Sequence, residues 1–145
     1  KASSIIRCIL TAVQQMHDAN VVHRDLKLNN LIFDRPFAEH SNDHDSKQET
    51  QEPTLTIIDF GDSRIVEDDK EYKTCVGTLN YISPEMLKPR KQGWELKKGD
   101  LWSIGVITFI LVTGKLPFNG RSKQETLEKI KNKEYKYEYP PDCES

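Results

Sequence analysis

The stretch "VVHRDLKLNNLIF", from Val21 to Phe33, places the densest group of polar side chains in this sequence between two short apolar runs. Such runs are typical of buried strands, and a polar loop held between them fixes its side chains near solvent. Within the loop, the spacing Asp25-x-Lys27-x-x-Asn30 offers a carboxylate, a cation and a neutral amide. This pattern predicts a loop that carries chemistry.

A second carboxylate, Asp59, ends the predicted strand "LTIID" at residues 55–59. Carboxylate and amide oxygens suit Mg²⁺, which binds one or two such ligands alongside phosphate. Asp25 could accept a proton from a hydroxyl group, and Lys27 could neutralise a phosphoryl group during its transfer. The alternative is that Asp25 and Asp59 are turn or cap acids, Lys27 a solvated lysine and Asn30 a turn residue.

Much of the remaining sequence is predicted to be helical. Apolar residues three and four apart predict a helix at 4–18. The nearly continuous apolar run at 100–112 predicts a buried central helix that follows a loop at 88–99, with Asp100 as its N-cap and Gly114 as its stop. Two further helices are predicted at 83–87 and 122–131. Residues 34–53 are polar and contain two prolines, which predicts a flexible surface insert rather than a metal site at "HSNDHD".

Composition excludes several classes of protein. The formal net charge is −2, so no general basic field favours nucleic acid. No apolar run approaches the roughly 20 residues of a membrane span, and the first residues do not read as a signal peptide. The three cysteines, Cys8, Cys75 and Cys143, are too few and too widely spaced for a disulfide framework or a zinc site. The expected location is the cytoplasm by default, or the nucleus.

Several motifs together resemble those of protein kinases. "HRDLKLNN" and "DFG" are similar to the catalytic loop and the metal-binding motif of that family, and "GTLNYISPE", "DLWSIGVI" and "GKLPF" follow in the family's order. The resemblance implies a protein-kinase-like α+β fold: a mainly helical C-terminal lobe with short β strands around the catalytic loop. Because a glycine-rich loop and a Val-Ala-Ile-Lys strand are missing, residues 1–145 are expected to be a partial kinase domain without the N-terminal lobe, interrupted by the 34–53 insert.

The resemblance also assigns roles to individual residues. It implies that Asp25 orients the substrate hydroxyl and receives its proton, and that Lys27 contacts the γ-phosphate of ATP. Asn30 and Asp59 would hold Mg²⁺. The residues expected to be structural are His23 and Phe60 in a stacked apolar spine, Gly61 of the "DFG" motif, Asp100 as the acid that anchors the catalytic loop, and Glu85 as half of a buried ion pair with a distant arginine.

A regulatory pair is expected beside the catalytic loop. Kinases with an arginine at the position of Arg24 usually pair it with a phosphate on the activation loop, and Thr74 lies where the family often carries that phosphate. The neighbouring acids at 67–71 could partly substitute for the phosphate. The alternative is that Thr74 is an ordinary loop residue.

Lys27 and the pair Gly77-Thr78 resemble serine/threonine kinases, and the sequence is most similar to the calcium/calmodulin-dependent and calcium-dependent branch. That similarity implies a protein substrate and a calcium-sensing regulatory region outside this chain. Two alternatives remain open. One is a truncated kinase-like scaffold or pseudokinase that binds partners without catalysis. The other is a small-molecule phosphotransferase of the same fold.

Overall fold

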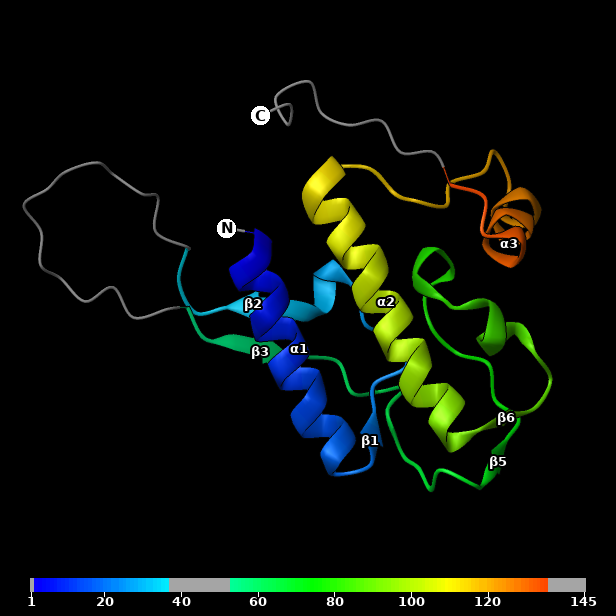
Figure 1. Cartoon of the computed structure of the whole chain (residues 1–145), viewed down its shortest axis with the longest axis horizontal. Coiled ribbons are helices and arrows are strands. Elements are labelled where there is room, and N and C mark those ends of the chain that lie inside the picture. The colour runs from blue at the N-terminus through cyan, green and yellow to red at the C-terminus, as the bar shows by residue number, and fades with distance from the viewer. Residues whose placement is uncertain (1, 37–52, 136–145) are drawn as a thin grey trace, which may run out of the picture.

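The computed structural model describes residues 2–36 and 53–135, in which three α-helices are joined by short strands and 3-10 turns (Figure 1). The helices are α1 (Ala2–Asp18), α2 (Gly93–Thr113) and α3 (Lys123–Asn132). The strands are β1 (Val21–Val22), β2 (Leu31–Phe33), β3 (Leu55–Ile57), β4 (Arg64–Ile65), β5 (Glu71–Tyr72) and β6 (Lys91–Gln92). The 3-10 turns are η1 (Leu28–Asn30), η2 (Leu79–Tyr81) and η3 (Pro84–Leu87).

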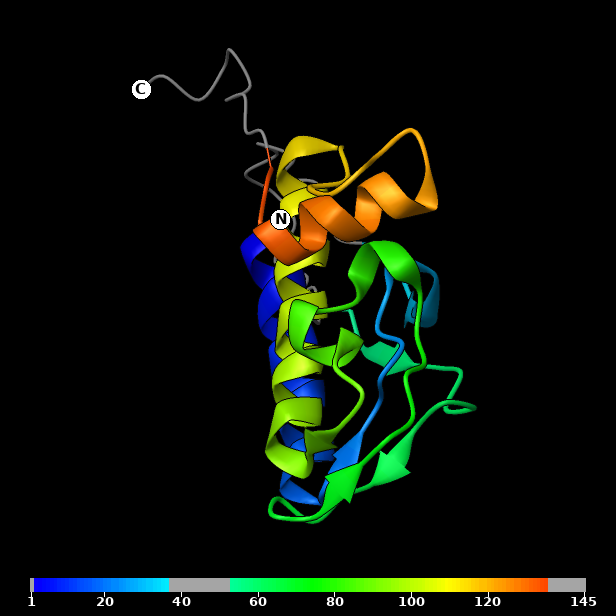
Figure 2. The same ribbon diagram turned by 90° about the vertical axis from the view of Figure 1, so that its right-hand side faces the viewer.

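Helices α1 and α2 pack side by side, and the short strands and turns lie against one face of this pair (Figure 2). The core between the layers is apolar. Ile9 and Val13 of α1 meet Ile104 and Ile107 of α2, and Leu26 of the polar loop is buried in the same cluster. Burying each such side chain contributes about 1.5–3 kcal/mol. Leu26 therefore ties the loop to the core between its two charged neighbours.

Three of the predicted helical segments are confirmed. Helix α1 covers the predicted range and begins two residues earlier, at Ala2. In η3 the Ser83 side chain accepts from the backbone N–H of Met86, as expected for an N-cap. Ser122 caps α3 in the same way, and Ile130 of that helix is fully buried.

The predicted strands that frame the polar loop are also confirmed, but they do not pair with each other. β1 pairs antiparallel with β4, with Val21 opposite Ile65, and β2 pairs antiparallel with β3, with Leu31 opposite Ile57. A third pair, β5 with β6, places Tyr72 opposite Lys91. No strand was predicted at β4, β5 or β6, and β6 falls in the loop predicted at 88–99. Each of these strands has only two residues, which is too short for a periodic sequence pattern. They form because of the strands they pair with.

The predicted start of the central helix is wrong. Helix α2 begins at Gly93 rather than Asp100, so most of the predicted loop at 88–99 is helical. A capping box between Gln92 and Glu95 stabilises this earlier start. Gly93 is required there because a Cβ atom would overlap the carbonyl oxygen of Glu67. Asp100 therefore lies inside the helix, and its carboxylate does not cap it. The predicted end is confirmed, because Gly114 ends α2 in the left-handed conformation.

The polar insert lies largely outside the described residues, and so does its "HSNDHD" segment. Its two ends are held together, because the N–H of Asp34 donates to the Thr54 carbonyl and the N–H of Thr54 donates to the Asp34 carboxylate. Cys8 and Cys75 are free thiols, and Cys143 is outside the described ranges. Among the described helices, none is both long and apolar enough to cross a membrane.

Candidate active site

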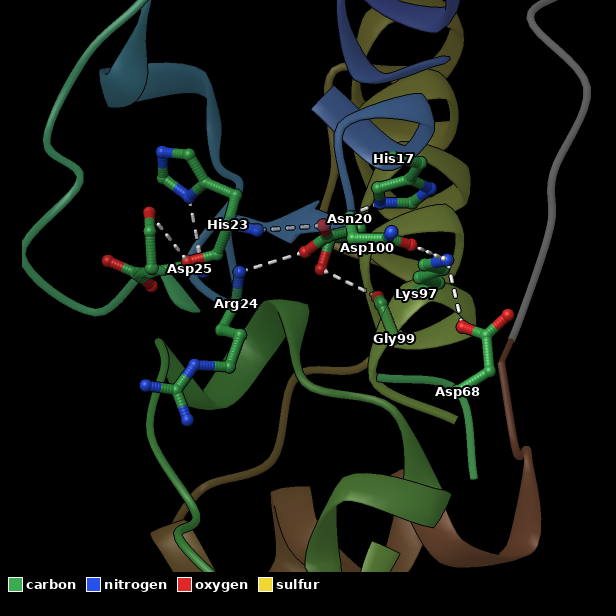
Figure 3. A network of polar contacts seen from close by, with 11 residues as sticks. His17, Asn20, His23, Arg24, Asp25, Asp68, Lys97, Gly99 and Asp100 are labelled. Atoms are coloured by element: carbon green, nitrogen blue, oxygen red, sulfur yellow. Dashed lines mark hydrogen bonds and ion pairs between the residues drawn. The ribbon is translucent and has the colours of Figure 1, made fainter. Parts of the chain in front are cut away.

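The polar loop is anchored from below by a carboxylate of α2. Asp100, 1% exposed, accepts hydrogen bonds from the backbone N–H groups of His23 and Arg24, each at 2.9 Å (Figure 3). The Nε2 atom of His17 in α1 lies 2.9 Å from the same carboxylate. These contacts hold Arg24 in a left-handed backbone conformation, with φ at 68°. Asp100 is thus placed where the kinase resemblance expects an anchor for the loop.

Asp25 forms a closed triangle with Lys27 and Thr78. Lys27 Nζ lies 2.5 Å from Asp25 Oδ2 and donates to Thr78 Oγ1 at 3.1 Å. Thr78 donates to Asp25 Oδ1 through both its hydroxyl (2.7 Å) and its backbone N–H (2.8 Å). One carboxylate and one ammonium therefore meet at a single hydroxyl group.

The charges in this triangle stabilise each other. Burial raises the pKa of Asp25, but the hydrogen bonds from Lys27 and Thr78, with the Lys27 charge, bring it below its ordinary value. The hydrogen bond to Asp25 raises the pKa of Lys27, and the charges of Asp59 and Asp62 raise it further. Both members of the pair are therefore ionised near neutral pH.

Thr78 was not predicted to be a site residue. Its position depends on Gly77, whose φ of 110° favours glycine and whose Cβ, if present, would lie 2.6 Å from the carbonyl oxygen of Arg24. The signal available in the sequence was the Gly77-Thr78 pair itself. Nothing local, however, shows that this pair packs on a loop some fifty residues earlier.

Asn30 and Asp59 are brought to the same end of the paired strands β2 and β3. Asn30 is buried and donates through Nδ2 to the carbonyl of Asp25 at 2.9 Å, which leaves its amide oxygen as a potential ligand. Its own carbonyl accepts from the N–H of Ile58 at 3.0 Å, directly before Asp59. The Asp59 charge also acts on Lys27.

This donor set fits Mg²⁺ in part. No group of three His, Cys, Asp or Glu side chains suited to a metal occurs in residues 2–36 and 53–135. An amide and a carboxylate oxygen are nevertheless the ligands expected for Mg²⁺ that also binds phosphate and water. The site is thus suited to a metal carried by a phosphorylated ligand rather than to a metal held by protein alone.

The sequence matches the protein kinase domain family over residues 1–144. This chain belongs to the protein kinase family. The match confirms the resemblance inferred from the motifs and the kinase-like fold class.

The similar proteins are protein kinases, and two of the three below are calcium-dependent by name. The chain is 40% identical to calcium/calmodulin-dependent protein kinase type 1 of Caenorhabditis briggsae and 37% identical to a probable myosin light chain kinase of Dictyostelium discoideum. It is 35% identical to calcium-dependent protein kinase 4 of Plasmodium berghei. Each alignment covers 96% of this chain but only 34%, 32% and 23% of the respective relative. The kinase chain described here therefore spans about a quarter to a third of the length of these proteins.

Three of the residues expected to be structural, His23, Phe60 and Gly61, lie around the Ile58–Asp59 segment. His23 is fully buried, and its Nδ1 accepts from the N–H of Asp25, so Nε2 carries the proton that is donated to the Ile58 carbonyl at 3.0 Å. Its ring lies 5.1 Å from that of Phe60, which is 49% exposed. A Cβ at Gly61 would press on the Asp59 carboxylate at 3.3 Å.

The expected regulatory pair of this kinase is in direct contact. Arg24 donates from its guanidinium to Thr74 Oγ1 at 2.9 Å and from Nε to the Asp62 carbonyl at 2.6 Å. Burial and the nearby charge of Arg64 lower the pKa of Arg24. Figure 3 shows its side chain directed away from Asp100, so the backbone and side chain of one residue serve two separate contacts.

Among the described residues, no ion pair joins Arg24 to an acid at 67–71, so substitution of these acids for a phosphate stays a prediction. Three of them form ion pairs with other cations: Glu67 with Lys70, Asp68 with Lys97, and Glu71 with Arg90. Glu85 in η3 is half-buried, and the described residues give it no ion pair. The arginine expected to pair with Glu85 therefore does not occur in this part of the chain.

Proposed function

We propose that the loop from His23 to Asn30 is the catalytic loop of a serine/threonine protein kinase, which transfers the γ-phosphoryl group of ATP to a hydroxyl of a protein substrate. The contact between Asp25, Lys27 and the Thr78 hydroxyl carries this proposal. It shows that the loop can accept a hydrogen bond from a hydroxyl and donate one to the same oxygen. A substrate serine or threonine would need this arrangement as its oxygen becomes the nucleophile.

In the proposed reaction, the substrate hydroxyl takes the place of Thr78 on Asp25. Its oxygen bonds to the γ-phosphorus, the bond from that phosphorus to the leaving ADP oxygen breaks, and Asp25 receives the proton. Lys27 offsets negative charge on the transferring group, so positioning and charge neutralisation supply most of the rate enhancement.

Asn30 and Asp59 are the residues that would hold Mg²⁺ against the phosphates of ATP. When bound, Mg²⁺ supplies charge neutralisation at the phosphate oxygens. Asn30 is buried, and its side chain donates to the Asp25 carbonyl. This hydrogen bond would keep the distance between the Asn30 amide oxygen and the Asp25 carboxylate constant.

Regulation is proposed at Thr74. Phosphorylation there would add nearly two negative charges beside Arg24. It would thereby tie the segment that carries Thr74, here called the activation segment, to the catalytic loop. The proposal concerns the protein at its natural length, in which this mainly helical lobe would act with an ATP-covering lobe. The names of two similar proteins support a calcium-sensing region as a further part of that protein.

The decisive experiment is Asp25→Asn in the natural-length protein, assayed for transfer of the ATP γ-phosphate to a serine peptide. We expect transfer to fall by a factor of about 10²–10⁴, because the proton acceptor is lost together with the charge that pairs with Lys27. The fold should be retained, since asparagine has nearly the shape of aspartate and keeps one acceptor oxygen for Thr78. Asp18→Asn, an exposed carboxylate at the end of α1, is the matched control and should keep full activity. Equal activity in both variants would refute the catalytic role. Inactive wild-type protein that still binds partners would instead favour the scaffold.

A further inference from the structure

Lys91 is a buried cation, and no acidic side chain of the described residues forms an ion pair with it. It is 1% exposed, and lysine is almost never fully buried unless its charge is paired. Within the described residues, its Nζ has one partner, the backbone carbonyl of Thr74 at 3.3 Å. The acids nearby are engaged elsewhere, Glu71 with Arg90 and Glu95 with Lys88. The Lys91 charge acts on the Glu95 carboxylate without contacting it, so Lys91 lacks the direct ion pair that burial of a charge normally requires.

The β5–β6 pair explains how the lysine comes to be buried. Tyr72 and Lys91 are directly opposite each other, so their side chains lie on the same face of the pair, and both are buried. The lysine extends along this face to Thr74, two residues beyond Tyr72. The guanidinium of Arg64, in strand β4 of a different pair, lies 5.2 Å from the centre of the Tyr72 ring.

Two cations thus contact Thr74 from different parts of the fold. Arg24 of the catalytic loop touches its hydroxyl oxygen at 2.9 Å, and Lys91 touches its carbonyl oxygen at 3.3 Å. Both oxygens belong to one residue, so a group attached to the hydroxyl would lie beside Arg24 and in the neighbourhood of Lys91. A phosphate monoester brings nearly two charges and three strong acceptor oxygens.

We propose that Lys91 is a second ligand, with Arg24, for a phosphate on Thr74. This inference deepens the proposed function and rests on Thr74 as its regulatory site. Without the phosphate, Lys91 is a buried charge that weakens the packing of the activation segment. With the phosphate, the same lysine joins that segment to the strand that precedes α2.

The test uses the natural-length protein made with either threonine or phosphothreonine at position 74, so that no kinase activity is needed to install the phosphate. Each form is prepared with Lys91 and with Lys91→Met, and its Tm is measured. We expect the phosphate to raise the Tm of the Lys91 protein and at least half of that increase to be lost in Lys91→Met. The unphosphorylated Lys91→Met protein should be as stable as the parent or more stable, because an unpaired buried charge has been replaced by an apolar chain of similar length.

Arg90→Gln is the matched control, since it removes a neighbouring but exposed cation and should leave the phosphate-dependent increase unchanged. A second readout is the ³¹P titration of the phosphothreonine, whose second pKa of about 6 should lie lower in the parent protein and rise by about 1 in Lys91→Met. If Lys91→Met fails to fold, Lys91→Arg, which keeps the charge, is compared with Lys91→Gln in the same two measurements.

Two results would overturn the proposal. One is a phosphate-dependent Tm increase that is the same with and without Lys91. The other is an equal loss of Tm in both forms of Lys91→Met, which would mean that the lysine only ties down the Thr74 carbonyl. Phosphoryl transfer is assayed separately: an inactive protein with a Lys91-dependent phosphate effect refutes only the catalytic proposal. An active protein without that effect refutes only the present inference.

Discussion

Asp100 and Lys91 lie nine residues apart in the chain, and each is 1% exposed, yet their surroundings are opposite. The Asp100 carboxylate has partners on both oxygens, from two backbone N–H groups and a histidine. The Lys91 ammonium has one carbonyl at 3.3 Å. The fold itself therefore supplies partners for the buried carboxylate that holds the loop at His23 and Arg24. For the buried ammonium beside Thr74 it supplies a single carbonyl among the described residues, which is why we propose a phosphate as its further partner.

The largest loss of stability is expected from removing the Asp100 carboxylate, whose two oxygens both have hydrogen-bond partners. Asp100→Ala leaves the buried N–H groups of His23 and Arg24 without acceptors, at about 1–3 kcal/mol each. We expect the free energy of unfolding, measured with urea, to fall by about 2–6 kcal/mol, a large part of the 5–15 kcal/mol typical of a domain. Asp68→Ala removes an exposed partner of Lys97 in the same region and should lower it by no more than about 1 kcal/mol. Similar losses in the two variants would show that Asp100 is not a special anchor.

A somewhat smaller loss of stability is expected where Gly77 packs against the backbone of Arg24. Gly77→Ala forces a Cβ toward the Arg24 carbonyl and requires a backbone conformation that alanine rarely adopts. We expect a loss of about 1–3 kcal/mol in the free energy of unfolding. Displacement of Thr78 should also move the Asp25 carboxyl pKa, measured by NMR, back toward its ordinary value. Gly105→Ala is the control, since a Cβ there has open space. An unchanged pKa in Gly77→Ala would contradict the contact with Thr78.

The stability of the folded protein should also depend on pH through the Asp25 carboxyl group. The pKa of the Asp25 carboxyl is lower in the folded protein than in the unfolded chain, where it is about 3.9. The ionised carboxylate therefore stabilises the fold at pH values above about 3.9. That stability is lost as the pH falls through the lower pKa of the folded protein. Lys27→Met should flatten this loss between neutral pH and pH 3, as followed by urea unfolding. Lys70→Met, which affects only an exposed pair, should leave the slope unchanged. An acid slope in Lys27→Met as steep as that of the parent would mean that Lys27 does not stabilise the carboxylate.

The smallest effect is expected at the exposed rim of the β5–β6 pair. Arg90→Gln breaks the 3.3 Å ion pair with Glu71, in which both side chains are about half exposed or more. Exposed pairs contribute up to about 1 kcal/mol, and raising the salt concentration should make the variant and the parent converge. A larger loss in urea unfolding, insensitive to salt, would show that the strand pair itself depends on Arg90.

The sequence was sufficient for the elements whose pattern is local. An amphipathic pattern predicted α1 and α3, apolar runs predicted β1 and β2, and a capping serine followed by proline predicted η3. The kinase motifs identified the loop that carries Asp25. These features can be recognised because each depends on residues that are close together in the chain.

What could not be predicted depends on distant partners. The start of α2 at Gly93 requires the close approach of Glu67, and Asp100 looked like a cap because its real partners lie more than seventy residues earlier. Thr78 joins the site through a backbone conformation at Gly77. Lys91 resembles any charged loop residue until β6 is seen to pair with β5 and to turn its side chain inward.

The position of Asp100 has a consequence for synthesis. The carboxylate that holds the His23 backbone lies 77 residues after it. At about 5–20 residues per second, a ribosome takes roughly 4–15 s to make that interval. During this time the catalytic loop has been translated but has no anchor, and its apolar neighbours have no α2 to cover them. Newly made chains should therefore bind chaperones most strongly in this window, and release should follow the emergence of α2 from the ribosome.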